Sequence, residues 1–233
     1  MTGFKNDDIN EFMNKINLKI QVYKSIKTSI LNFQLLPGVK LSEKSIAQDM
    51  GISRTPVKAA LIRLSEQGLI KAHHNRGFTV KSFKAEEIYN LYTVREALEI
   101  LAIQQATPNL DKKKEKKLRE PVDRCLSLMK SNNLIGMIDC DEKFHKLIAL
   151  YSENNTLINF LNSINYQIRI ARRYDHLHGD STKIDYEEHS KIIDFMVQKE
   201  VSKASKTISR HVTRARGIIL NILKVRQAHL FGQ

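Results

Sequence analysis

Three histidines and one aspartate lie on apolar helix faces in the C-terminal half of this 233-residue chain. Asp141 and His145 are four residues apart, so both side chains should project from one face of a helix. His189 and His211 each share a helical stripe with aliphatic residues. Burying such groups without partners costs roughly 1–3 kcal/mol each, and one shared divalent cation would satisfy all four. Aspartate and histidine ligands suit zinc, nickel, manganese or iron.

Simpler interpretations of these residues stay open. Each histidine could be a core residue with its own hydrogen-bond partner, and Asp141 with His145 could be a local pair on one helix. Arg95 also lies on an apolar stripe of its helix. We propose that its guanidinium faces the same cavity and pairs with the carboxylate of a bound small acid. The alternative is a buried salt bridge, for example to Glu99 or Asp141.

The elements that carry these residues are predicted to be helices. From residue 84 to residue 226 only helical periods occur, interrupted by turn-forming residues such as Pro108 and the Gly179-Asp180 pair. The periodicity predicts helices at 84–106, 111–131, 133–151, 156–177, 182–199 and 201–226. This half should therefore be an all-helical bundle.

Between Leu41 and Val80 the sequence predicts two short helices joined by a tight turn. Ser42 is a good N-cap for the first helix, and Gly51 can adopt the left-handed conformation that ends it. Ser53 can cap the second helix, in which Pro56 occupies the first turn, where its missing N–H costs little. The buried face of the second helix should consist of Val57, Ala60, Leu61 and Leu64.

The outer face of the second helix is cationic, and a hairpin follows it. Arg54, Thr55 and Lys58 lie off the buried stripe. Residues 69–73 and 78–80 are predicted to be two strands. The turn between them consists of His74, Asn75, Arg76 and Gly77. Two helices with outward cations and a two-stranded wing with a basic tip are typical of a winged helix-turn-helix that binds DNA.

Residues 17–80 resemble the DNA-binding domain of the GntR family of bacterial transcription regulators, through LLPGVKLSEKSIAQDMGISRTPVKAALIRLSEQGLI and the later RGFTV. The resemblance implies that residues of the two helices approach DNA, and that the wing at 74–77 enters the minor groove. The helix residues are Lys44, Ser53, Arg54, Thr55 and Lys58. The family usually has arginine at position 58. Lysine lacks the bidentate fork of arginine, so we expect Lys58 to contact phosphate.

Residues 84–225 resemble the FCD-type ligand-binding domain of one large GntR subgroup. The motif DEKFH, a later EH and a final histidine after KEVSKA match that domain in order and spacing. The resemblance implies that a divalent metal is bound by Asp141, His145, His189 and His211. Six helices rather than seven suggest the shorter, VanR-like version. A Lys199-Glu200 pair stands where the family often has Gly-Asp, which affects a turn and no ligand.

Composition limits the partners and the compartment. The formal charge of +13 favours a polyanionic partner. No apolar run approaches the length of a membrane span, so we expect no membrane association. Two cysteines, Cys125 and Cys140, provide no disulfide framework, which favours the cytoplasm. The predicted organisation is a mobile tail at 1–15, a winged domain at 16–80, a linker at 81–83, a metal- and effector-binding domain at 84–226 and a tail at 227–233.

We therefore expect a mainly α-helical, homodimeric transcription regulator, with repression as the expected mode. A small organic acid bound beside the metal, with zinc as the expected ion, should control its affinity for double-stranded operator DNA. In an alternative function the metal ion itself is the signal. A metal-dependent hydrolase is a remote alternative, because the candidate bases Glu142 and Glu188 are rotated off the ligand face and a winged helix has no purpose in an enzyme of that kind.

Overall fold

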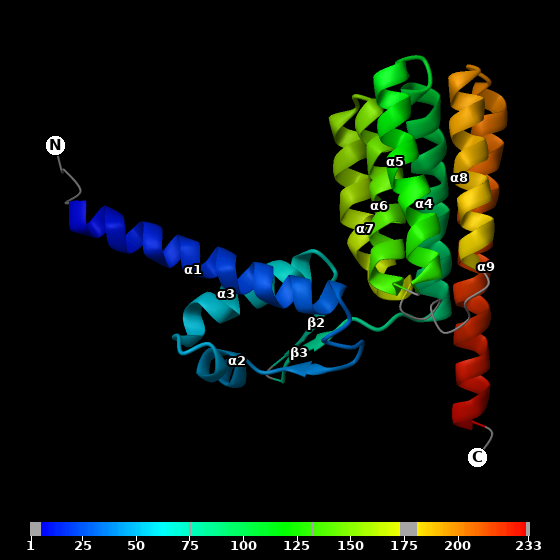
Figure 1. The fold of residues 1–233 in the computed structure, drawn as a ribbon. Helices are drawn as coiled ribbons and strands as arrows, with labels where there is room; N and C mark the ends of the chain where they lie inside the picture. Colours follow the sequence, from blue (N-terminus) through cyan, green and yellow to red (C-terminus); the bar gives the residue numbers. More distant parts are fainter. Residues whose placement is uncertain (1–5, 75, 132, 173–180, 232–233) are drawn as a thin grey trace. The chain divides into compact units, whose positions relative to one another are not determined.

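The computed structural model describes residues 6–74, 76–131, 133–172 and 181–231. The chain forms two compact units, Met1–Ser82 and Phe83–Gln233. The first unit is a winged helix-turn-helix, and the second is an all-helical bundle (Figure 1). Both architectures agree with the sequence prediction.

The first unit places the helix-turn-helix against a long N-terminal helix. Its elements are α1 (Asn6–Leu31), β1 (Lys40–Leu41), α2 (Glu43–Asp49), α3 (Arg54–Glu66), β2 (Ile70–His73) and β3 (Gly77–Val80). The α3 stripe predicted to be buried is buried, and it packs with the apolar side of α1. The two stripes consist of Val57, Ala60, Leu61 and Leu64 on α3, and Val22, Ile26 and Ile30 on α1.

Local chemistry sets the ends of α2 and α3. The Ser42 hydroxyl accepts a hydrogen bond from the Ser45 N–H at 3.3 Å, as expected of an N-cap. Gly51 follows α2 with φ +64°, the left-handed conformation that glycine adopts without a Cβ clash. Ser53 occupies the N-cap position of α3, but its side chain makes no capping hydrogen bond. Ser42 therefore fixes the start of α2, and Gly51 allows the turn between α2 and α3.

The wing contains a third strand that the sequence analysis missed. The sheet is antiparallel in the order β1-β3-β2, with Lys40 paired to Thr79 and Leu41 paired to Phe78. The predicted hairpin is confirmed as β2 and β3. The additional strand β1 was not predicted because it has only two residues, too few to show the alternation that identifies a strand.

The described residues of the two predicted tails are helical. Helix α1 begins at Asn6, within the segment 1–15 that was expected to be a mobile tail, and α9 extends to Phe231, within the segment 227–233. Helices lengthen by adding one backbone hydrogen bond per residue, which does not require an apolar face. An apolar stripe therefore marks the packed part of a helix and not its end.

The second unit contains six helices in its described residues, as predicted. They are α4 (Ala85–Ala106), α5 (Lys112–Lys130), α6 (Leu134–Tyr151), α7 (Asn155–Arg172), α8 (Ser181–Val197) and α9 (Val201–Phe231). Helix α4 packs against α6, α7 and α9, and α8 packs against α5 and α9 (Figure 1). Residues 173–177, the predicted end of α7, lie outside the described residues. Among the described residues, no helix combines the length and apolar character that a bilayer crossing needs.

The turn between α8 and α9 is stabilised by Lys199. Its backbone has φ +58°, a left-handed conformation that costs a non-glycine residue roughly 1–2 kcal/mol. Its ammonium donates hydrogen bonds to the carbonyl oxygens of Thr107 (2.8 Å), Pro108 (3.3 Å) and Leu110 (2.8 Å), at the end of α4. These hydrogen bonds offset the cost of the left-handed conformation, at a position where the FCD-type domains that this chain resembles often have glycine.

We expect Lys199→Ala to lower the free energy of unfolding by about 1–2 kcal/mol, because the charged hydrogen bonds are lost and the backbone cost stays. Lys199→Gly loses the same bonds but also removes the left-handed penalty, so its loss should be smaller by about 1 kcal/mol. Urea unfolding followed by circular dichroism measures both. If Lys199→Ala and Lys199→Gly were equally stable, the left-handed backbone conformation at this position would have no cost, which would contradict the prediction.

Candidate metal centre and nucleic-acid interface

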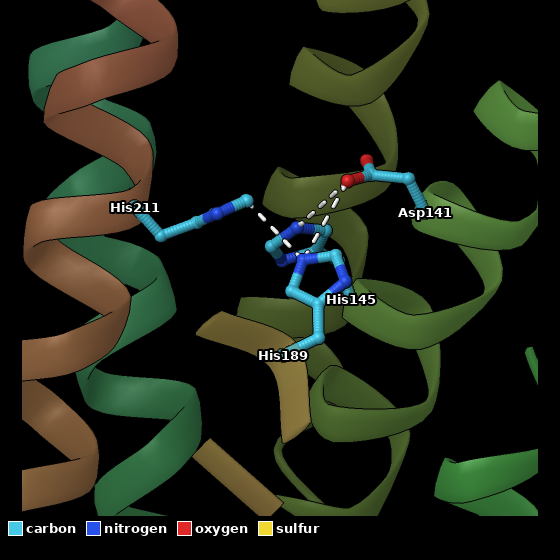
Figure 2. Close-up of side chains that lie close together, drawn as sticks. All are labelled: Asp141, His145, His189 and His211. Carbon is cyan, nitrogen blue, oxygen red and sulfur yellow. Dashed lines mark hydrogen bonds and ion pairs between the residues drawn. The ribbon is translucent and has the colours of Figure 1, made fainter. Parts of the chain in front are cut away.

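The four predicted metal ligands meet in the interior of the helical unit. Helix α6 supplies Asp141 and His145, α8 supplies His189 and α9 supplies His211 (Figure 2). One candidate ligand atom from each lies within 4.8 Å of all the others. The four residues are only 1–8% exposed. The stripes that were read from the sequence thus bring all four side chains to one place.

The imidazole nitrogens in the cluster face one another and the carboxylate. His189 Nε2 lies 3.3 Å from His211 Nε2 and 3.6 Å from Asp141 Oδ1. His145 Nε2 lies 3.7 Å from the same carboxylate oxygen (Figure 2). Among the described residues, neither Asp141 Oδ1 nor His145 Nε2 has a hydrogen-bond partner, although both are buried. Buried polar atoms without partners are costly, so this donor set fits a bound divalent cation.

The protonation state of His189 also suits a metal ligand. Burial and the neighbouring His211 lower the pKa of His189 well below its usual value. Its ring stacks on Phe144, with 4.0 Å between the ring centroids. A neutral imidazole held in a fixed orientation is the form that donates a lone pair to a metal.

Two glutamates contact the outer nitrogens of the cluster. Glu99 Oε1 lies 3.1 Å from His145 Nδ1, and Glu188 Oε2 lies 3.1 Å from His211 Nδ1. Burial alone would raise the pKa of Glu188, but His211 and Arg214 lower it to about 2, so this group is a carboxylate. The sequence analysis considered Glu188 only as a base of the remote hydrolase and placed it off the ligand face. Its other candidate base, Glu142, accepts a hydrogen bond from Arg169 at 2.8 Å.

Arg172 belongs to a group of basic residues, Arg169, Arg172 and Arg173. Their local spacing predicts a solvated helix face, and the alternative is that one of them lines the pocket. Instead Arg169 and Arg172 are only 5% and 6% exposed, while Arg173 lies outside the described residues. The Arg172 guanidinium donates through Nη1 to Asp141 Oδ2, while its Nε is buried without a partner in the described residues. Burial would raise the pKa of Asp141, but Arg172, His145 and His189 lower it well below its ordinary value.

Arg95 forms a buried salt bridge, which the sequence left open as the alternative to a contact with a bound acid. It is 3% exposed, and its Nε lies 3.2 Å from Glu99 Oε1 in a buried salt bridge. Because Glu99 also contacts His145, Arg95 is linked to the cluster through that carboxylate. A contact between Arg95 and a small acid stays a prediction.

The predicted DNA-binding residues of the winged unit lie on its surface. Lys44, Ser53, Arg54, Thr55 and Lys58 are exposed, as are His74 and Arg76, whereas Gly77 is half-buried and Asn75 lies outside the described residues. Lys44, Lys58 and Arg76 line one groove, together with Lys40. Lys40 was not predicted to contact DNA because it lies in β1, a strand that was not predicted from the sequence. A cationic groove between α3 and a wing suits the phosphates of a DNA backbone.

Two models of known protein families match this chain, and together they decide which family it belongs to. The FCD domain model matches residues 90–214, which is more than half of the chain. The model of bacterial regulatory proteins of the gntR family matches residues 18–80. The chain belongs to the GntR family, in its FCD group.

Similar proteins agree with this assignment. The "Uncharacterized HTH-type transcriptional regulator YdhC" of Bacillus subtilis is 27% identical, with 82% of this chain and 86% of the relative covered. The "Nta operon transcriptional regulator" of Aminobacter aminovorans is 26% identical, with 83% and 90% covered. The solved structure of Escherichia coli McbR/YncC has a TM-score of 0.76 at 20% identity, with 87% and 96% covered, and shows that the fold is shared.

This GntR regulator is therefore a DNA-binding transcription regulator and not an enzyme, as the sequence predicted. The winged unit is the part that binds operator DNA, and the cluster of Asp141 and three histidines lies within the FCD domain.

Proposed function

We propose that this GntR regulator is a homodimeric repressor whose operator affinity is controlled by a small carboxylic acid. In this proposal the acid binds beside a divalent metal, with zinc as the expected ion, held by Asp141, His145, His189 and His211. The proposal is supported by two buried atoms, Asp141 Oδ1 and His145 Nε2, which have no hydrogen-bond partner in the described part of the chain and lie beside two further imidazole nitrogens.

The choice of a carboxylate rests on the charges around the cluster. Three buried carboxylates, on Glu99, Asp141 and Glu188, are paired with the guanidiniums of Arg95, Arg172 and Arg214. Asp185 shares Arg214 with Glu188, so four carboxylates face these three guanidiniums before any ion is added. A divalent cation adds two positive charges and would leave an excess of positive charge in a medium of low dielectric constant. A small anion at the ion's open coordination positions would restore the balance.

Arg172 and Arg95 are the guanidiniums that could receive the acid. When bound, an ion that takes six ligands would have two coordination positions left open by the four proposed ligand residues, and carboxylate oxygens can fill them. Arg172 uses Nη1 for Asp141, which leaves the edge formed by Nε and Nη2 for a bidentate contact. Arg95 uses Nε for Glu99, so only its terminal nitrogens could reach an acid.

Control of DNA binding requires that the acid binds two arrangements of the dimer with different affinities. A symmetric dimer presents two winged units to a pseudo-palindromic operator, so a change in their spacing or mobility alters binding. The acid would then act by shifting the population toward an arrangement that fits the operator less well.

Fluorescence anisotropy of a duplex from upstream of the regulator's own gene tests the proposal. The protein is titrated with zinc alone, and then with zinc plus acetate, lactate, malonate or citrate. We expect metal-loaded protein to bind the duplex, and at least one acid to weaken binding fivefold or more, equivalent to about 1 kcal/mol of coupling. If zinc alone changes affinity and no acid does, the ion itself is the signal. Unchanged affinity in every titration would refute control at this site.

A further inference from the structure

Two of the clustered histidines have a glutamate on their outer side, which is hydrogen-bonded to the ring in the Glu188–His211 pair and within ion-pair distance of it in the Glu99–His145 pair. In each, Nε2 belongs to the cluster, while Nδ1 lies 3.1 Å from a glutamate oxygen. In each pair the glutamate and the histidine come from different helices: Glu99 of α4 contacts His145 of α6, and Glu188 of α8 contacts His211 of α9. The two contacts therefore link four helices at the cluster.

We propose that Glu99 and Glu188 are positioning residues, which hold His145 and His211 with Nε2 directed at the metal. This inference rests on the metal site of the proposed function. A carboxylate can only accept, so its contact favours a proton on Nδ1 and leaves the lone pair on Nε2. Outer-shell carboxylates of this kind fix both the tautomer and the ring orientation of metal-binding histidines.

The two glutamates are themselves held by arginines. Glu99 is fully buried and lies 3.2 Å from Arg95 Nε. Glu188 is 5% exposed and lies 2.7 Å from Arg214 Nη2 and 3.2 Å from Arg210 Nε. In each pair the guanidinium contacts the same glutamate oxygen as the histidine, which keeps the carboxylate charged and fixes its direction. Each histidine is thus oriented by an arginine acting through a glutamate.

Glu142 provides a matched comparison. It follows the predicted ligand Asp141 directly, and its carboxylate also accepts a hydrogen bond from an arginine, Arg169, at 2.8 Å. The described contacts of Glu142 include no imidazole. It therefore has the same chemistry and an arginine partner, but its side chain is 32% exposed and it has no histidine to position.

Cobalt(II) binding to the full-length protein, followed by visible absorption, tests the inference. We expect Glu188→Ala to weaken cobalt affinity about 10–100-fold, the range typical of such outer-shell residues. The absorption bands of the bound ion should also change, because the His211 ring is no longer fixed. Glu188→Gln should restore affinity to within about threefold of wild type, since an amide oxygen still accepts from Nδ1–H. The Glu99 variants should behave in the same way, and Glu142→Ala should bind cobalt like the wild type.

Thermal unfolding of the metal-free variants, measured in parallel, separates positioning from a loss of folding. Glu188→Gln retains the side-chain volume, so it reports on the site even if an alanine variant does not fold. The inference is overturned if the Glu188 and Glu99 variants bind cobalt like wild type, or if Glu142→Ala loses as much affinity as they do. Wild-type protein that binds no cobalt would instead refute the proposed metal site, and this inference with it.

Discussion

Replacing His189 with alanine should weaken metal binding by this regulator about 100-fold or more. His189 is the central ligand of the cluster, because its Nε2 lies within 3.6 Å of both His211 Nε2 and Asp141 Oδ1. Zinc-finger peptides, which also supply four protein ligands, bind zinc with apparent free energies of about 10–16 kcal/mol. One ligand's share is therefore roughly 3 kcal/mol, so affinity should fall about 100-fold or more.

Metal content of the purified protein by mass spectrometry, together with calorimetric zinc titration, measures this loss. His73→Ala is the matched control, because His73 lies in the wing, where its Nε2 contacts Thr79 Oγ1 at 2.8 Å. That variant should retain full metal content. Zinc should also raise the melting temperature of the wild type and the control but not that of His189→Ala, since a ligand stabilises only the state that binds it. A full metal complement in His189→Ala would contradict the assignment of this residue.

The predicted ligands could be found from the sequence because each lies in a local pattern. A four-residue spacing places Asp141 and His145 on one helix face, and aliphatic neighbours at helical spacing orient His189 and His211 inward. The number of helices in the bundle follows from the same periodicity. Such patterns predict which face of its own helix a side chain lies on. This was sufficient to predict that these four side chains face the interior.

Arg172 shows where local patterns fail. Arginines at positions 169 and 172 are one turn apart near the end of α7, a spacing that usually indicates a solvated face. Both are buried because carboxylates of α6, about 30 residues earlier in the chain, face them: Asp141 for Arg172, and Asp139 and Glu142 for Arg169. No local pattern in the sequence predicts that these arginines pair with carboxylates of another helix. The contact between Glu188 and His211 was missed for the same reason, because it depends on how α8 packs against α9.

Replacing Arg54 with alanine should weaken operator binding by about 5–150-fold, the equivalent of about 1–3 kcal/mol for one good base contact. Arg54 is the first residue of α3 and is exposed, and the positive end of the helix dipole adds to its attraction for DNA. Lys58, one turn further along, is expected to contact phosphate. Its replacement should weaken binding to all sequences equally and reduce the dependence of log affinity on log salt by about one unit.

Anisotropy titrations with an operator duplex and a scrambled duplex, each at several salt concentrations, separate the two roles. Arg54→Ala should lose much of the preference for the operator, whereas Lys58→Ala should retain that preference at lower overall affinity. Lys116→Ala is the control, because it removes one exposed positive charge from α5 of the helical unit and leaves the winged unit intact. Its affinity should stay within about twofold of wild type, because salt screens distant charges. Unchanged operator affinity in Arg54→Ala would show that the N-terminus of α3 does not read the operator.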